Sequence, residues 1–488
     1  MEERKGFGTN FGFLMAAVGS AVGLGNIWGF PNKMGASGGF TFLVIYLVLA
    51  VLCGFIVMVG ELALGRKTHH GAVGAYKALS KKFKWMGWLG ILSAFFILFF
   101  YCALGGYCIK YTVLNIGDLF HAGFGANALA ETAAANGNSL GAEVFGAFMS
   151  SPTEAIVFGL IFVAITMIIV IGGIGGGIEK VCSVGMPALF VMLLICIIRA
   201  CTLEGAVDGL KYMFVPGWAV ANGVIEEAPG FLTVLSTAGG QMFFSLSLGM
   251  GAMITYGSYL DKKENLQKNA ILIIVMDTLV ALMAGLCVIP GRFALDPTGA
   301  LGGPKLLFVT MQNVFSRMGG FGPIFGILFY LLVVFAAVSS SISLLEVIVA
   351  HFVDKARNEG KGDMRKKYTL IAAACVGVGC ILVCADRLGD ASFTPWKLLN
   401  LPAESIRTWN DCWLDFWDML SEGIMMPLGA LLMSLMFGWE VGTDVVKEEC
   451  EASGHAMGSY GFFKVCIKYI TPLIMILILY GQIKEFFF

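Results

Sequence analysis

Charged residues are scarce in this chain of 488 residues: Asp, Glu, Lys and Arg make up 13% of it, against about 25% in a typical soluble domain. The formal net charge is −1, and no basic face is available, so nucleic-acid binding is excluded. The sequence has 13 cysteines but no C-x-x-C pair or Cys/His cluster with metal-ligand spacing. We therefore expect free, mostly buried thiols and no cysteine-bound metal.

Apolar residues and glycine are abundant instead. Hydrophobic residues make up 58% of the chain, which also contains 64 Gly, 39 Phe and 25 Met, and the mean hydropathy is +0.82. No soluble globule needs that much apolar material, even at a size where most of the surface is buried. The composition predicts an all-α polytopic membrane protein with the lipid bilayer as its surroundings.

Runs of the length required to cross a bilayer, about 20 apolar residues, recur along the whole chain. They predict about eleven transmembrane helices. The segments are 10–32, 39–65, 88–116, 155–173, 181–201, 231–258, 269–290, 321–352, 368–384, 418–439 and 463–481. The charged start MEERKGFGTN leads into the first segment without a cleavage-type end, so we expect a retained helix and not a removed signal.

Lys and Arg in the connections predict the orientation in the membrane. They gather in residues 66–84, 262–268 and 355–367, three connections that lie on one side if the segments alternate, whereas residues 118–152 contain none. Because basic loops stay in the cytoplasm, we expect a cytoplasmic N-terminus and, with an odd number of segments, an external C-terminus.

The first and sixth segments are unusual for membrane helices. They read GSAVGLGNIWGFP (Gly19–Pro31) and FFSLSLGMGAM (Phe243–Met253), with glycines and small polar residues at mid-membrane depth. Close helix packing through small residues is the alternative explanation. However, interrupted helices at matching positions of two halves indicate a transporter substrate site, since unpaired backbone groups are tolerated in a membrane only around a cavity.

These motifs, together with VFAAVSSS around residues 334–341, resemble the neurotransmitter:sodium symporter family with the leucine-transporter fold. The resemblance implies a 5+5 inverted repeat with discontinuous first and sixth helices. It implies one transporter domain, 1–488, with repeat one at about 10–201, repeat two at about 231–442 and an extra helix at about 463–482. The sequence looks like a bacterial amino-acid member of the family, which implies a location in the cytoplasmic (inner) membrane.

The resemblance further implies two Na⁺ sites built from oxygen ligands, which suit a hard cation. The first comprises the Ala21 carbonyl, Asn26, Ser245 and a residue of the seventh helix, completed by the substrate carboxylate. The second comprises the carbonyls of Gly19, Val22 and Ala336 and the hydroxyls of Ser339 and Ser340. Serine hydroxyls bonded to their own helix are the alternative for the Ser339–Ser341 run.

Asp277 occupies a position where many family members have Asn. An ionisable residue inside a membrane helix is a candidate functional residue by default, and we expect Asp277 to be a ligand of the first Na⁺ site. Chloride-dependent animal members have Ser four residues further on, where this chain has Ala281. The charge of Asp277 would supply what chloride supplies there, so we expect no chloride requirement.

The substrate class follows from Gly23, which replaces the Asp of amine-transporting relatives. A glycine leaves room for a substrate carboxylate, held by Tyr101 and the amides of Leu24 and Gly25, so we expect a small-molecule amino acid. The implied substrate-binding residues are Ala21, Gly23, Leu24, Gly25, Ile97, Tyr101, Phe243, Phe244, Ser245, Ser247, Met250, Ser340 and Leu344. An apolar, partly Met-lined pocket favours hydrophobic or aromatic L-amino acids, although Met250 has lipid-facing packing as an alternative.

The gates of the family are only partly matched. Arg4 and Asp354 fall at the positions of its cytoplasmic Arg–Asp pair, with Phe7 as an aromatic that stabilises the N-terminal tail. Asp418 matches the acid of the outer pair, but the partner Arg is replaced by Gly29. We therefore expect a Tyr101–Phe244 aromatic lid to close the outer side, unless Lys33 supplies the missing cation.

Two other acids lie inside predicted membrane helices. Glu61 matches a family acid near the cytoplasmic end of the second helix and is expected to have a structural partner. Glu346 lies seven residues after Ser339, about two turns further along the same helix face. It is either a buried, hydrogen-bonded acid or a participant in proton counter-movement.

The resemblance implies sodium-coupled import of hydrophobic or aromatic amino acids by alternating access, and three other functions are alternatives to it. The first is the same fold with a narrow substrate, such as tryptophan or a small amino acid. The second is an amino-acid-gated channel or receptor without coupled transport. The third is a membrane enzyme, which is disfavoured because no His/Asp/Glu or Ser/Lys constellation is present in the apolar segments. The sequence leaves the oligomeric state open.

Overall fold

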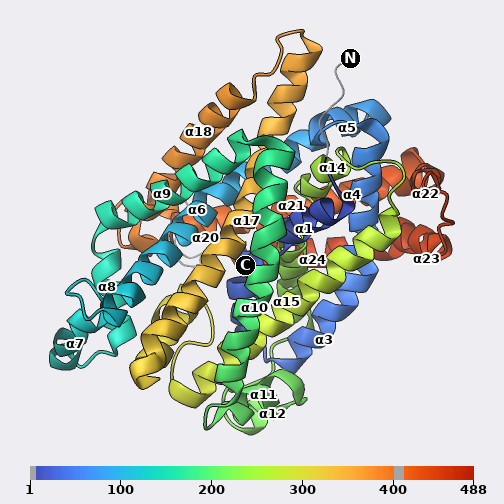
Figure 1. The fold of residues 1–488 in the computed structure, drawn as a ribbon. Helices are drawn as coiled ribbons and strands as arrows, with labels where there is room; N and C mark the ends of the chain where they lie inside the picture. Colours follow the sequence, from blue (N-terminus) through green and yellow to red (C-terminus); the bar gives the residue numbers. More distant parts are fainter. Residues whose placement is uncertain (1–6, 400–410, 488) are drawn as a thin grey trace.

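The computed structural model describes residues 7–399 and 411–487, and within these ranges the chain is helical without a strand. Long helices pack side by side through the molecule, with short ones at both ends (Figure 1). The first half contains α1 (Asn10–Ala21), α2 (Phe30–Ala36), α3 (Phe40–Leu49), α4 (Phe55–Thr68), α5 (Ala72–Leu79), α6 (Met86–Leu119), α7 (Ala130–Asn136), α8 (Leu140–Met149), α9 (Pro152–Ile171), α10 (Lys180–Cys201), α11 (Ala206–Phe214) and α12 (Trp218–Ala221).

The second half has the same composition of long and short helices. It contains α13 (Phe231–Ser245), α14 (Ala252–Gly257), α15 (Leu266–Leu295), α16 (Met311–Ser316), α17 (Gly322–Asn358), α18 (Arg365–Ala385), α19 (Pro395–Leu399), α20 (Trp413–Asp418), α21 (Met426–Leu435), α22 (Asp444–Glu451), α23 (Tyr460–Val465) and α24 (Thr471–Phe487). Wider π-helical segments join several of them: Gly25–Gly29, Ala50–Gly54, Ile174–Glu179, Leu306–Thr310, Met419–Met425, Met436–Glu440 and Cys466–Ile470. The all-α prediction is confirmed.

The described residues include 9 helices long and apolar enough to cross a membrane, and the bent pair formed by α1 and Gly25–Ala36 would make a tenth. The sixth predicted segment is also present, but it is divided into α13 and α14, each too short to span alone. The eleven predicted segments therefore all correspond to helices, and the two predicted to be interrupted are the two that are broken.

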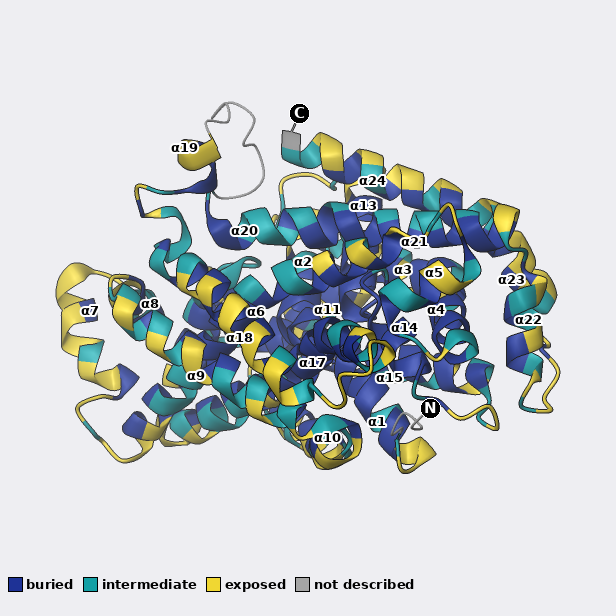
Figure 2. Cartoon of the chain, turned by 90° about the horizontal axis from the view of Figure 1, so that it is seen from above, coloured by how far each residue is buried: buried dark blue, intermediate teal, exposed yellow. Residues whose placement is uncertain are grey.

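Burial separates the helices at the centre from those at the rim. In α6, 78% of the most apolar stretch is buried, against 33% in α9 and 33% in Ile174–Cys201. Figure 2 shows the same gradient, with dark blue around α1, α14 and α17 and yellow on the outer helices. Apolar side chains on α9 and α10 such as Ile168 and Val184 are exposed, as expected of surfaces that face lipid.

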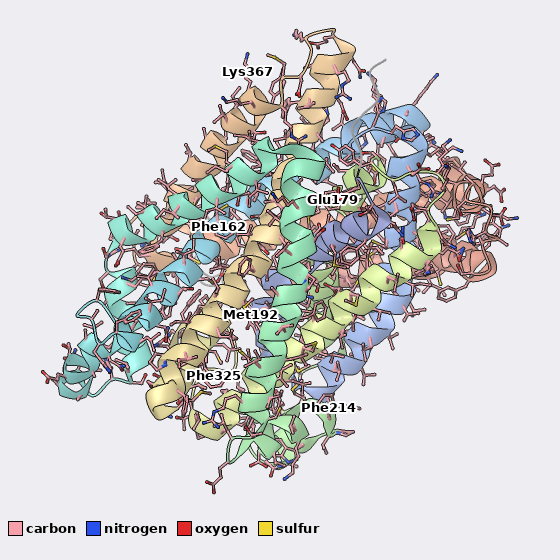
Figure 3. The ribbon with its side chains drawn as sticks, viewed as in Figure 1. Phe162, Glu179, Met192, Phe214, Phe325 and Lys367 are labelled. Atoms are coloured by element: carbon pink, nitrogen blue, oxygen red, sulfur yellow. The ribbon has the colours of Figure 1, made fainter. Side chains whose placement is uncertain are left out.

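The two ends of the molecule carry different connections. The N-terminal side, defined here by Phe7 and the loop between α14 and α15, also has α5 and the start of α18, where Lys367 lies (Figure 3). The opposite side has α7, α8, α11 and α12 (Figure 1). Residues 118–152, expected as a loop, are therefore largely helical, although they remain free of Lys and Arg.

Candidate functional site

The first helix is interrupted at the middle of the molecule. Thr9 begins α1 as its N-cap, since its Oγ1 accepts a hydrogen bond from the Gly12 N–H at 2.9 Å. The helix ends at Ala21, because Val22 turns to an extended conformation (φ −74°, ψ 103°). The chain then resumes as the π-helical turn Gly25–Gly29, with its axis bent by 44°. The Val22 carbonyl and the N–H groups of Gly23 and Leu24 are thus released from regular helix bonding and face side chains instead.

The second interruption separates α13 from α14. Gly249 and Gly251 have φ values of +79° and +78°, a region that glycine adopts without strain. Gly249 has a further constraint, because a Cβ there would lie 2.3 Å from the carbonyl oxygen of Met426. Ser247 is also left-handed, with φ +53°, and a non-glycine residue in this region indicates a functionally constrained backbone.

Buried polar side chains hold the two interruptions together. The Ser247 hydroxyl donates to the Ser20 carbonyl at 2.8 Å, and the Gln241 amide donates to the Gly25 carbonyl at 2.6 Å. Glu61, fully buried on α4, accepts the Gly249 N–H at 2.7 Å. The structural partner expected for Glu61 is therefore the unwound segment between α13 and α14.

Asn26, Ser245 and Asp277 lie together beside the first interruption. The Asn26 amide donates to the Asp277 carboxylate at 2.7 Å and accepts the Gly23 N–H at 2.9 Å. The Ser245 hydroxyl lies 3.1 and 3.0 Å from the two Asp277 carboxylate oxygens. Tyr46, which the sequence did not single out, donates to the same carboxylate at 3.3 Å. Ala21, the other predicted member of this set, is buried at the end of α1.

The Asp277 carboxylate contacts no basic side chain among the described residues. Its side chain is 0% exposed, and its three hydrogen-bond partners are all neutral. No ion pair to it occurs among the residues that the structure describes. Because an ionised carboxylate buried without a cation costs several kcal/mol, and because the neighbouring oxygens are hard ligands, this group of residues fits a bound monovalent cation.

A second group of oxygens joins α1 to α17. The Ser339 hydroxyl lies 3.3 Å from the Val22 carbonyl and 2.9 Å from the Ala336 carbonyl. The Ser340 hydroxyl lies 3.2 Å from the Gly19 carbonyl and 3.3 Å from the Val22 carbonyl. The structure therefore brings together all five residues predicted for the second Na⁺ site. Only one of these hydrogen bonds is to the serine's own helix, which disfavours local back-bonding for Ser340 and as the main role of Ser339. Ser341, in contrast, does bond to its own helix, at the Val338 carbonyl.

Gly23, Tyr101 and Ser340 converge on one point between these two groups. The Leu24 N–H donates to the Tyr101 hydroxyl at 2.9 Å. A Cβ at Gly23 would lie 2.4 Å from the Tyr101 hydroxyl and 2.2 Å from the Ser340 hydroxyl. The space beside Gly23, expected to be left open for a carboxylate, is therefore occupied here by two hydroxyls. Glycine is nevertheless required, because any side chain would collide with both.

The remaining predicted substrate residues are buried, and Phe244 lies beside this point. The Phe244 ring lies 6.3 Å from the Tyr101 ring and covers Gly25, where a Cβ would be 3.0 Å from it. Met250 is 2% exposed, which excludes the alternative that it packs against lipid. The others, Ile97, Phe243, Ser245, Ser247 and Leu344, are likewise buried.

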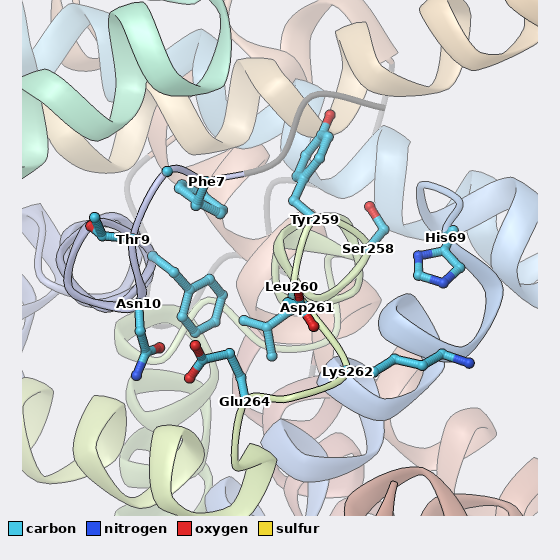
Figure 4. Close-up of a pocket in the computed structure, with 12 residues that line it drawn as sticks. Phe7, Thr9, Asn10, His69, Ser258, Tyr259, Leu260, Asp261, Lys262 and Glu264 are labelled. Atoms are coloured by element: carbon cyan, nitrogen blue, oxygen red, sulfur yellow. The ribbon is translucent and has the colours of Figure 1, made fainter. Parts of the chain in front are cut away.

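On the N-terminal side, Phe7 packs edge-on against Phe13, Tyr256 and Tyr259. A cavity of about 770 Å³ opens beside it, lined by Phe7, Tyr259 and the charged loop Asp261–Glu264 among others (Figure 4). The expected partner of Asp354, Arg4, lies outside the described residues. Asp354 itself accepts the Gly71 N–H at 3.2 Å.

Glu346 has two partners on this same side. Its carboxylate forms an ion pair with Arg365 of α18 and accepts the Tyr259 hydroxyl at 2.7 Å. Arg365 also donates to the Val170 carbonyl of α9 at 3.0 Å. The buried, hydrogen-bonded interpretation of Glu346 is thus the one that the geometry favours.

On the opposite side, Asp418 is not the acid that Lys33 contacts. Lys33 forms an ion pair with Glu422, four residues after Asp418. Sequence reasoning missed Glu422, and it also missed Ser20, Tyr46, Gln241 and Arg365. Ser20 and Gln241 had local signals, since Ser20 lies inside the GSAVGLGNIWGFP motif and Gln241 lies two residues before the FFSLSLGMGAM motif. The others become visible only when distant helices are brought together.

Comparison with known proteins follows the same motifs. The family model of the sodium:neurotransmitter symporter family matches residues 4–121 and 151–394. The chain belongs to that family. An uncharacterized sodium-dependent transporter of Bacillus subtilis, YhdH, is 31% identical over 96% of each chain. Another uncharacterized sodium-dependent transporter, from Haemophilus influenzae, is 30% identical over 98% of each chain.

Among solved structures, this symporter is similar to MhsT in complex with L-phenylalanine. The TM-score is 0.82 and the identity 31%, and the match covers 98% of this chain and 100% of that one. The family and the membrane-spanning helices confirm a sodium-dependent membrane transporter with the leucine-transporter fold.

Proposed function

We propose that this protein imports hydrophobic and aromatic L-amino acids by sodium-coupled symport across the bacterial cytoplasmic membrane, with its N-terminal side in the cytoplasm. The observation that carries the proposal is Asp277, a fully buried carboxylate surrounded by neutral donors beside the interruption of the first helix. Such a site favours a bound cation, and it lies next to the backbone that would hold a substrate. The MhsT structure, which contains L-phenylalanine, supports the substrate class.

Two sodium ions are proposed. The first would be held by Ala21, Asn26, Ser245, Asp277 and the substrate carboxylate, so that ion and substrate bind together. The second would be held by the carbonyls of Gly19, Val22 and Ala336 and the hydroxyls of Ser339 and Ser340, where hydroxyls and carbonyls already face one another. An ion there would replace hydrogen bonds between α1 and α17 with coordination to the same oxygens.

The substrate would bind beside Gly23. Its carboxylate would accept from the Tyr101 hydroxyl and from the Leu24 N–H, which the structure pairs with each other at 2.9 Å. Its side chain would lie among Ile97, Phe244 and Met250. An amine substrate without a carboxylate would leave Tyr101 and the first sodium ion short of a partner, which disfavours it.

Sodium supplies enough free energy for this transport. A tenfold sodium gradient gives ~1.4 kcal/mol per ion, and ~100 mV adds ~2.3 kcal/mol per charge. Two ions would supply roughly 7 kcal/mol, enough for about 10⁵-fold accumulation of a neutral amino acid. Ions and substrate shift the transporter between outward- and inward-facing states only by binding these states unequally.

The test is uptake of labelled phenylalanine, leucine and tryptophan by proteoliposomes, with sodium or potassium as the external cation. We expect concentrative uptake in sodium only, and competition by hydrophobic but not by charged amino acids. Equal flux in both cations would contradict coupling and support a channel. Uptake of a single amino acid without competition by other hydrophobic ones would support the narrow-substrate alternative.

A further inference from the structure

We propose that the ion pair between Lys33 and Glu422 holds the opposite-side entrance of the transport site closed. This inference rests on the proposed function, because it assigns a gate to the same site. It replaces the pair between position 29 and Asp418 that the family resemblance implied, and it explains how an entrance without that arginine can close.

Position 29 has no room for a gating side chain while Gln241 keeps the position it has here. A Cβ at Gly29 would lie 2.7 Å from the Gln241 side-chain oxygen. The same Gln241 is anchored, because its amide donates to the Gly25 carbonyl at 2.6 Å. The glutamine therefore fills the volume that a longer residue would need, and an arginine there would have to displace a buried hydrogen bond.

Lys33 supplies the cation one turn later. Residues four apart share a face of a helix, so Lys33 on α2 points to the same side as position 29. Its partner Glu422 lies four residues after Asp418, in the π-helical segment Met419–Met425. Both members of the pair are thus displaced by four residues from the positions that the family pattern marks.

The pair lies directly outside the substrate region. A Cβ at Gly240 would lie 2.9 Å from a Glu422 carboxylate oxygen, so this carboxylate reaches α13 as well as α2. Gly240 precedes Phe244, the proposed lid residue, by four residues. The contact therefore joins α2 and α13, the outer halves of the two broken helices, to the spanning helix Trp413–Glu440. These three elements cannot separate unless the ion pair breaks.

Burial makes the pair energetically important. The Glu422 side chain is 7% exposed and that of Lys33 is 20% exposed, so solvent and salt screen their attraction weakly. Removing one partner leaves the other charge buried without compensation. Asp418 contacts Glu422 directly and, like Glu485, interacts electrostatically with Lys33. Because Glu422 is the carboxylate that contacts Lys33, Asp418→Asn, which keeps a hydrogen-bonding group beside Glu422, should change little.

The test compares Lys33→Met and Glu422→Gln with the matched control Lys110→Met. Lys110 forms an ion pair with Glu154 between α6 and α9, two neighbouring helices that the gate does not include. The first readout, hydrogen–deuterium exchange of the purified full-length protein in sodium, needs no substrate. We expect faster exchange over residues 25–36 and 419–425 in both gate variants, and no change there in Lys110→Met.

The second readout is dissociation of labelled phenylalanine from the purified transporter. We expect at least about tenfold faster dissociation in the gate variants, partial recovery in Lys33→Glu/Glu422→Lys, and less than about twofold change in Asp418→Asn. A thermal-unfolding midpoint within the range of the control shows that each variant is folded.

Three outcomes would overturn the proposal: exchange in the gate variants equal to that of the control, faster dissociation without faster exchange, or no recovery in the charge-reversed double variant. If the unmodified protein does not bind or take up amino acids, the proposed function fails by itself. The exchange comparison then still decides whether the pair closes the entrance.

Discussion

The two proposed sodium sites lie on either side of the interrupted first helix and differ in charge. The first contains Asp277, fully buried and bonded to Asn26 and Ser245. The second offers three carbonyls and two hydroxyls and no ionised group. Both groups bind through oxygen, but only the first carries a charge that the protein cannot leave unpaired.

The difference indicates what each site does. A buried carboxylate favours a bound cation, so we expect the first site to be occupied whenever substrate is bound. We also expect this site to determine whether transport needs chloride. A neutral oxygen cage can be emptied by replacing ion coordination with the hydroxyl-to-carbonyl hydrogen bonds seen here. We therefore expect the second proposed ion to be the one released first.

The largest effect should come from Asp277→Asn. Removing the charge keeps the shape but takes away the cation's only anionic protein ligand, and we expect uptake to fall at least about a hundredfold. Asp277→Glu, which keeps the charge, should retain measurable uptake with a raised sodium requirement. Wild-type uptake by Asp277→Asn at ordinary sodium concentration would remove the distinction between the two sites.

A smaller effect is expected from the second site. Ser340→Ala removes a hydroxyl that contacts carbonyls of Gly19 and Val22, and we expect the sodium concentration for half-maximal uptake to rise about fivefold. Ser341→Ala is the matched control, because its hydroxyl faces Val338 and Thr166 instead. Equal sodium dependence in the two variants would contradict a sodium role for the serine run.

Much of this arrangement could be predicted from sequence, because the signals were local. The interruptions at Gly23–Gly25 and Gly249–Gly251 are visible as glycines where a membrane helix would have leucine. Asp277 stands out because acids are rare in the apolar segments. The motif positions of Ser339 and Ser340 needed only the family resemblance to be placed with Gly19 and Val22.

What sequence reasoning missed depends on pairs of distant residues. In the sequence Tyr46 looks like any aromatic residue in an apolar helix. Only the folded structure shows that its hydroxyl lies 3.3 Å from an Asp277 carboxylate oxygen. Glu422 was overlooked because Asp418 already matched the expected acid, and only the reach of the Lys33 side chain selects between two carboxylates one turn apart. That hydroxyls lie beside Gly23 could not be predicted, because they come from two other helices.

Tyr46→Phe tests how much a neutral donor contributes to the charged first site. It removes one neutral donor from Asp277 but leaves the cation and the other ligands in place, so we expect sodium affinity to change by about threefold at most. Tyr330→Phe serves as the control, since its hydroxyl donates to the Leu307 carbonyl at 2.9 Å, away from both sites. A change confined to Tyr46→Phe would show that the hydroxyl tunes the charged site.

The smallest effect on uptake is expected from removing chloride. If the Asp277 carboxylate supplies the negative charge that balances the first sodium ion, replacing chloride with gluconate should leave uptake by the wild-type protein unchanged. Ala281 offers no hydroxyl to an anion, whereas relatives that need chloride have Ser at that position. Uptake that disappears in gluconate would mean that Asp277 is protonated or otherwise neutralised during transport. In that case the charge difference between the two sites would not operate in the working cycle.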